Sequence, residues 1–154
     1  MNHTLPILAV EDNDEDFDML QLSFQGAGIP NPLYRCAEGE EALEFLSHTG
    51  RYVDAGLAPR PGLVLLDLNI IGLDGRQVLE QMKKDSSLKQ IPVLVFTTSD
   101  NPQDVHSAYS SGASGYLLKP VDLERFETMI HRFKEFWLEH ILLPDGEHRG
   151  VAHG

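Results

Sequence analysis

The fold of this chain is decided by one short apolar stretch, Gly62-Leu63-Val64-Leu65-Leu66-Asp67-Leu68-Asn69. A continuous apolar run of this length is typical of a strand that is buried on both faces inside a parallel sheet. The run leads to a single carboxylate, Asp67, at its carboxyl end. Because open α/β sheets bind their ligands beyond the carboxyl ends of the strands, we expect Asp67 to lie in the functional crevice.

Four further apolar runs predict strands, and a segment with helical periodicity follows each strand. These strands are expected at residues 5–10, 33–37, 91–98 and 114–119. The last helix is expected to begin after Pro120 and to continue to about Leu143. Strict alternation of strands and helices predicts a doubly wound α/β domain: a five-stranded parallel sheet with helices on both faces and an extended C-terminal helix.

Two segments lie outside this alternation. The domain is expected to cover residues 1–143, and the polar, Gly-rich residues 144–154 are expected to form a disordered tail, which leaves no segment for an output domain. Residues 49–61 show no periodicity. The sequence leaves open whether this long loop has a function or is mobile.

The composition argues against several classes of protein. The formal net charge is −12, whereas a nucleic-acid surface needs clustered Lys and Arg, so we expect no nucleic-acid partner. No apolar run approaches the roughly 20 residues that span a bilayer, and the N-terminus lacks the pattern of a signal peptide, so no membrane association is expected. Cys36 is the single cysteine, and we expect it to pack inertly in a protein of the reducing cytoplasm.

Polar side chains follow four of the five predicted strands, at the point where each strand ends. They are Glu11 and Asp12 after the first strand, Asp67 after the third, Thr97 and Thr98 at the fourth, and Lys119 at the fifth. Because the carboxyl ends of parallel strands meet at one edge of a sheet, we expect these side chains to lie close together.

The three carboxylates predict a metal site. A pair of like charges about 4 Å apart costs around 4 kcal/mol at an effective dielectric constant of about 20, and a divalent cation offsets this repulsion. Mg²⁺ fits best, since it takes one or two carboxylates and leaves room for waters and phosphate oxygens. We predict Glu11, Asp12 and Asp67 as ligands, completed by the backbone carbonyl of Asn69. Capping of the first helix is the alternative for the acidic loop; Asp14 and Asp16 are assigned to capping alone.

The remaining polar groups suit phosphoryl transfer to a carboxylate. Lys119 can supply a fixed positive charge for the phosphoryl oxygens, and the Thr97 hydroxyl can donate a hydrogen bond to them. Asp67 is then the group that accepts the phosphoryl.

At this point the chain resembles the receiver domain of two-component response regulators (CheY-like) over about residues 5 to 135. The resemblance is carried by Glu11-Asp12, by Asp67 with Asn69 two residues on, and by residues 92–98 and 112–120. It implies a flavodoxin-like fold with strand order 2-1-3-4-5. It also implies that a sensor histidine kinase phosphorylates Asp67 from a phosphohistidine, with Mg²⁺ as cofactor, and that the Lys119–Pro120 peptide bond is cis.

The resemblance extends to three further residues. Thr98 and Ser99 are implied to flank the phosphoryl group and to tune the access of hydrolytic water. Tyr116 is implied to swing into the space behind Thr97 when the latter moves toward the phosphoryl group; a plain core aromatic is the alternative. The loop at 49–61 and the extended last helix are similar to those of the single-domain response regulators that pair with cyanobacterial phytochromes, which implies such a kinase as partner.

The last helix carries an unusually wide apolar surface. Phe126, Ile130, Phe133 and Trp137 form one stripe at helical spacing, and Met129, Phe136 and residues 141–143 add to it. One sheet face needs less than this. The surface either belongs to a longer core or forms a homodimer contact made by the fourth and fifth helices with the fifth strand.

We therefore expect a phosphorylation-controlled signalling switch that catalyses its own phosphotransfer and dephosphorylation and acts through protein contacts. Two other classes fit less well. A haloacid-dehalogenase-like phosphatase needs a second Asp where this chain has Asn69, and a nucleotide-binding module needs a Gly-rich loop after the first strand, where this chain has Glu11-Asp12-Asn13-Asp14. A receiver-like scaffold or dimerisation module that is never phosphorylated stays open.

Overall fold

The protein forms one parallel sheet of five strands in the order β2-β1-β3-β4-β5, in a computed structural model that describes residues 4–144. The strands are β1 (Ile7–Val10), β2 (Leu33–Cys36), β3 (Leu63–Leu66), β4 (Val93–Thr97) and β5 (Gly115–Leu118). Each lies inside a run that the sequence predicted as a strand. The predicted fold class and the strand order implied by the resemblance are both confirmed.

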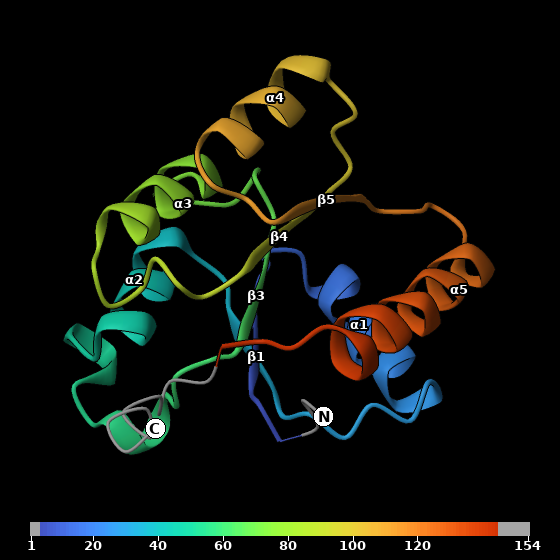
Figure 1. Ribbon diagram of the computed structural model, residues 1–154, viewed down its shortest axis with the longest axis horizontal. Helices are drawn as coiled ribbons and strands as arrows, with labels where there is room; N and C mark the ends of the chain where they lie inside the picture. Colours follow the sequence, from blue (N-terminus) through green and yellow to red (C-terminus); the bar gives the residue numbers. More distant parts are fainter. Residues whose placement is uncertain (1–3, 145–154) are drawn as a thin grey trace.

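Five α-helices cover the two faces of the sheet (Figure 1). They are α1 (Asp14–Gly26), α2 (Gly39–Ser47), α3 (Gly75–Lys84), α4 (Pro102–Ser110) and α5 (Leu123–Phe133). Helices α1 and α5 lie on one side, and α2 and α3 lie on the other. Within residues 4–144, no helix is long and apolar enough to cross a membrane.

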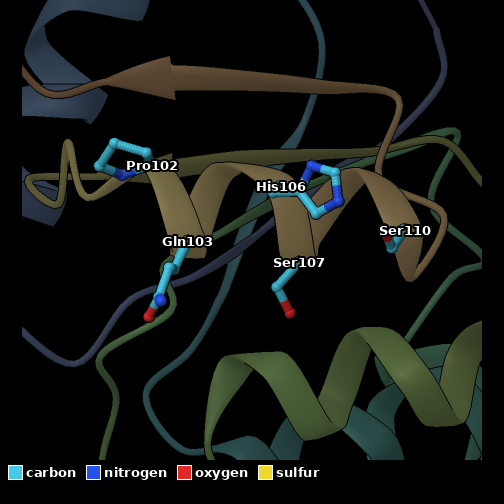
Figure 2. A pocket seen from close by; sticks show the side chains of 5 residues that line it. All are labelled: Pro102, Gln103, His106, Ser107 and Ser110. Atoms are coloured by element: carbon cyan, nitrogen blue, oxygen red, sulfur yellow. The ribbon is translucent and has the colours of Figure 1, made fainter.

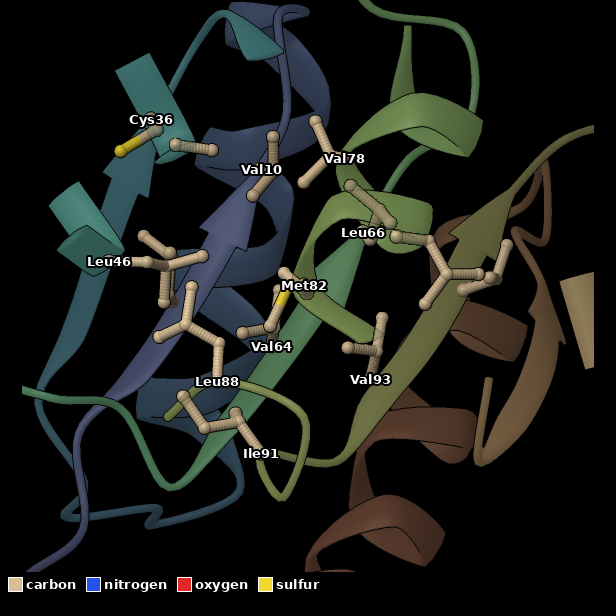
Figure 3. Packing of buried hydrophobic residues seen from close by; sticks show 14 of the residues in the cluster. Val10, Cys36, Leu46, Val64, Leu66, Val78, Met82, Leu88, Ile91 and Val93 are labelled. Carbon is tan, nitrogen blue, oxygen red and sulfur yellow. The ribbon is translucent and has the colours of Figure 1, made fainter. Parts of the chain in front are cut away.

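The two faces bury alternate residues of the same strands, as a period of two requires. On β3, Val64 and Leu66 belong to the cluster on the α2 and α3 side, whereas Leu63 and Leu65 belong to the cluster on the α1 and α5 side. Figure 3 shows the first of these clusters, with Cys36 at its margin. Burial raises the pKa of the Cys36 thiol to about 12, which suits the packing role predicted for it.

The segment at 49–61 has local structure that its sequence pattern did not reveal. It contains two short 3₁₀ turns, η1 (Gly50–Tyr52) and η2 (Ala55–Leu57). Arg51 Nε donates to Glu44 Oε1 at 2.8 Å, and Tyr52 Oη donates to Glu41 Oε2 at 2.7 Å. These bonds attach the first turn to α2.

The last helix departs from the prediction in its second half. Helix α5 continues as a π-helical segment, η3 (Lys134–His140), and Ile141 is already extended, so the helix ends three residues before the expected Leu143. A π-turn holds more residues than an α-turn and rotates the following side chains around the axis. Phe126, Ile130 and Phe133 are buried as predicted, but Leu138 is the fourth buried residue, and Trp137 is only half-buried.

One backbone prediction is wrong. Among residues 4–144 no peptide bond is cis, so Lys119–Pro120 is trans. The two isomers of an X-Pro bond differ by only about 0.5–1 kcal/mol, and the local sequence therefore does not fix which one the fold selects. The predicted tail, apart from Pro144, lies outside the described residues.

The register shift of η3 makes a testable prediction. Leu138 is 1% exposed and Phe136 is 56% exposed. We expect Leu138→Ala to lower the free energy of unfolding by about 2–4 kcal/mol, because it leaves a cavity in the core, and Phe136→Ala to change it by less than about 1 kcal/mol. Urea denaturation of both variants tests this, and equal losses would contradict the shifted register.

Candidate functional site

The parallel register brings the ends of β1 and β3 together. Val10 pairs with Leu66, so Glu11 and Asp67 are the next residues on two adjacent strands, and the Asp67 N–H donates to the Val10 carbonyl at 3.1 Å. Helix α3 approaches the same point closely, since a Cβ at Gly75 would lie 2.2 Å from the Asp67 carbonyl oxygen. The main chain around Asp67 is therefore held on two sides.

Lys119 reaches this point from the end of β5, two strands away. Its ammonium donates to Glu11 Oε1 at 2.5 Å, to Asp67 Oδ2 at 2.8 Å and to Asp16 Oδ2 at 2.9 Å. On the way its Nζ lies 5.6 Å from the centroid of the Phe96 ring on β4. The long side chain thus spans β4 and places one positive charge among the acids.

Three carboxylates form the acidic group that the sequence predicted. Glu11, Asp12 and Asp67 each offer an oxygen, and these oxygens lie within 4.8 Å of one another. The N–H of Asn13 donates to Glu11 Oε2 at 3.2 Å, and the N–H of Asn69 donates to Asp67 Oδ1 at 3.1 Å. A set of hard oxygen donors that is already oriented by the backbone fits a divalent cation.

Burial changes the charge balance of the site. Removal from water raises the pKa of Glu11 to about 7, against the lowering effect of the Lys119 ammonium. Burial alone would lower the pKa of Lys119, but its bonds to Asp67, Glu11 and Asp16 outweigh burial and raise it well above its ordinary value. Lys119 is therefore a fixed cation, while Glu11 can gain a proton near neutral pH.

The hydroxyl residues at the end of β4 take different positions. Thr97 is fully buried, and its Oγ1 accepts only a long bond, 3.5 Å, from the N–H of Ser99. Thr98 is exposed. The Ser99 hydroxyl donates to Asp104 Oδ2 at 2.6 Å, so it is bonded to α4.

Tyr116 is half-buried and packs against the core cluster on the α2 and α3 side. Its hydroxyl donates to the Ser99 carbonyl at 2.8 Å. The side chain therefore combines the core contact and the contact with the β4–α4 loop that the sequence left as alternatives.

Three residues of the site and its surroundings were missed. Asp16 was assigned to helix capping alone, yet its carboxylate binds Lys119; its spacing of four residues from Asp12 was the available signal. Arg76 NH2 donates to Asp104 Oδ1 at 2.8 Å and joins the start of α3 to α4. Nothing in the sequence pattern links these two residues, which are 28 positions apart.

Comparison with known proteins places the chain in a family. Residues 7–131 match the response regulator receiver domain. The chain belongs to the response regulator receiver domain family. It is 39% identical to the response regulator Rcp1 of Synechocystis sp. over 138 residues, which cover 90% of this chain and 92% of Rcp1.

Solved structures agree with this placement. The phosphorylated cyanobacterial phytochrome response regulator RcpA superposes with a TM-score of 0.85 at 35% identity, covering 92% of this chain and 99% of RcpA. The Mn²⁺-bound form of Rcp1 gives 0.84 at 38% identity with the same coverage. The response regulator RPA3017 in red light signaling of R. palustris gives 0.85 at 34% identity, again with 92% and 99% covered.

The resemblance predicted from the sequence, to receiver domains and to phytochrome response regulators, is confirmed. This receiver domain is a two-component signalling protein rather than a conventional enzyme. The readings as a phosphatase or a nucleotide-binding module are therefore set aside.

Proposed function

We propose that Asp67 accepts a phosphoryl group from a phosphohistidine of a sensor histidine kinase, and that the protein signals by the resulting change in conformation. The observation that carries this proposal is the direct bond, 2.8 Å, from the buried Lys119 ammonium to Asp67 Oδ2. A carboxylate with a fixed cation beside it lies where charge develops on a transferring phosphoryl group. The kinship with phytochrome response regulators supports a phytochrome as the kinase.

In the proposed transfer, an Asp67 oxygen forms a bond to phosphorus while the bond from phosphorus to the histidine nitrogen breaks, and the electron pair stays on the imidazole. Lys119 donates to a phosphoryl oxygen, and the Thr97 hydroxyl donates to another. Thr98 and Ser99 border the group on the side of the β4–α4 loop and tune the access of water. The same site then catalyses its own dephosphorylation, when water attacks phosphorus and Asp67 leaves.

Glu11, Asp12 and Asp67, with the Asn69 carbonyl, are the groups we assign to Mg²⁺. Their mutual distances and the Mn²⁺-bound form of the relative Rcp1 support this. When bound, the cation neutralises charge on the carboxylates and on the phosphoryl oxygens.

The proposed output runs through the β4–α4 loop. Phosphorylation adds about −1.5 to −2 charges, which favours movement of the loosely bonded Thr97 hydroxyl toward the phosphoryl group. Such a movement pulls on Ser99 two residues later, whose carbonyl is bonded to Tyr116. Tyr116 is therefore the side chain that responds first on the opposite side of the loop.

A homodimer through α4, β5 and α5 is the second part of the proposal. Leu118 and Leu123 are about half exposed and Val121 almost completely. Two hollows of about 270 Å³ each flank β5: one is lined by Val105, Tyr109, Tyr116, Leu118 and Asp100, and the other by Leu117, Met129, Arg132, Phe133, Phe136 and Trp137. Exposed apolar surface of this extent is typical of a protein interface.

The outer side of α4 is polar by comparison. Its hollow of about 580 Å³ is lined by Pro102, Gln103, His106, Ser107 and Ser110, with Gln103 and Ser107 pointing away from β5 (Figure 2). The apolar part of the proposed dimer contact therefore comes from β5 and α5. Protein partners of this kind, without nucleic acid or membrane, place the protein in the cytoplasm.

The phosphoacceptor assignment is tested with acetyl phosphate and Mg²⁺. We expect the wild-type protein to gain one phosphoryl group by intact mass, Asp67→Asn to gain none, and the control Asp54→Asn, in the loop at 49–61, to behave as wild type. A wild-type protein that gains no phosphoryl group, from acetyl phosphate or from its kinase, would instead support the scaffold reading.

The metal assignment predicts a pH dependence. Because the pKa of Glu11 is raised to about 7, Glu11 holds a proton below that pH and must release it to bind Mg²⁺. The dissociation constant should therefore rise as pH falls below 7, by up to about tenfold per pH unit, and level off above it. Calorimetric titrations between pH 6 and 8 measure this, with Glu11→Gln expected to bind weakly and independently of pH. A wild-type constant that does not vary would contradict it.

The dimer assignment predicts a dimer in sedimentation velocity at micromolar concentration. Leu118→Glu should weaken the association about tenfold or more, because it places a charge in an apolar contact. Leu57→Glu is the matched control, since Leu57 is similarly exposed but lies in η2, away from β5. A wild-type monomer both with and without phosphorylation would exclude the interface.

A further inference from the structure

The Lys119 ammonium has no donor left for a phosphoryl oxygen. An ammonium has three N–H groups, and in this structure they are matched by three carboxylates, those of Glu11, Asp67 and Asp16, at 2.5–2.9 Å. If Lys119 is to bind a phosphoryl group on Asp67, it must give up one of these partners.

The three partners differ in their access to water. The side chains of Glu11 and Asp67 are 6% and 10% exposed, whereas that of Asp16 is 36% exposed. A buried carboxylate that loses its cation is left uncompensated in a medium of low dielectric constant, which is strongly unfavourable. Water can solvate Asp16 when its bond breaks. Asp16 is therefore the partner that Lys119 can exchange most readily.

The main chain of Asp16 does not have to move in this exchange. Its N–H donates to the side chain of Asn13 at 2.8 Å, which caps α1. Rotation of the Asp16 side chain alone breaks its bond to Lys119. After phosphorylation, repulsion between a dianionic phosphoryl group and the Asp16 carboxylate favours that rotation.

We propose that Asp16 is a positioning residue that holds Lys119 in the unphosphorylated site and yields its hydrogen bond to the incoming phosphoryl group. The proposal rests on the proposed roles of Asp67 and Lys119. Asp16 and the phosphoryl group then compete for the same N–H, so Asp16 favours the unphosphorylated state. Removal of its charge should make phosphorylation faster, although it removes a contact from the folded protein.

The test uses Asp16→Asn, which keeps the size of the side chain and removes its charge. We expect the initial rate of phosphorylation by acetyl phosphate with Mg²⁺, followed by intact mass, to rise about two- to fivefold, the range that a partly exposed ion pair supports. In the metal-free protein the thermal midpoint should fall, and the Lys119 ammonium protons should exchange faster with water in NMR spectra.

Asp14→Asn is the matched control. Asp14 lies in the same helical turn and carries the same charge, but it pairs with Arg35 at 2.7 Å and is 84% exposed; we expect no change in rate. In a Lys119→Met background, Asp16→Asn should give no gain, because Asp16 acts through the ammonium. A two- to fivefold gain in either of these proteins would overturn the proposal and indicate general electrostatic repulsion.

The outcomes separate the two levels of inference. A wild-type protein that gains no phosphoryl group overturns the proposed function. A wild-type protein that is phosphorylated, with Asp16→Asn at the same or a lower rate, overturns only the role of Asp16.

Discussion

One ammonium group, that of Lys119, allows four carboxylates to stand together at one edge of the sheet. The order β1-β3 places Glu11, Asp12 and Asp67 on adjacent strand ends, and α1 adds Asp16. Their repulsion in a buried site is large, and one cation does not neutralise it. The site therefore combines a permanent shortage of positive charge with fixed geometry. Both the raised pKa of Glu11 and the fit to a divalent cation follow from that shortage.

The parts that could be predicted depend on local patterns. Each strand is a continuous apolar run, and each site residue follows directly after one, so the edge at which Glu11, Asp67 and Lys119 meet follows from chain order and parallel topology alone. The order of the strands came from the resemblance to receiver domains. Periodicity does not determine it, because any right-handed doubly wound arrangement satisfies the same pattern.

The parts that could not be predicted depend on the reach of side chains and on small energy differences. Asp16 satisfies the capping pattern of a first helical turn equally well whether or not it binds Lys119. Arg76 and Asp104 meet only because α3 and α4 are neighbours in space. In the last helix, the stripe at α-helical spacing gave the right face through Phe133 and the wrong residue at Trp137, since a π-turn has no clear signal in the sequence.

The β4–α4 loop is held at Ser99 from two sides. The Ser99 hydroxyl is bonded to Asp104, which Arg76 bonds in turn to the start of α3, and the Ser99 carbonyl is bonded to Tyr116 on β5. Thr97, two residues earlier, has only one long bond at its hydroxyl. In the proposed switch, Thr97 is therefore free to respond to a phosphoryl group, while any further movement must break a bond at Ser99. A loop held in this way changes between discrete arrangements rather than gradually. The message from Asp67 then reaches α4 and β5 as an exchange of hydrogen bonds, on the same face that we assign to the dimer.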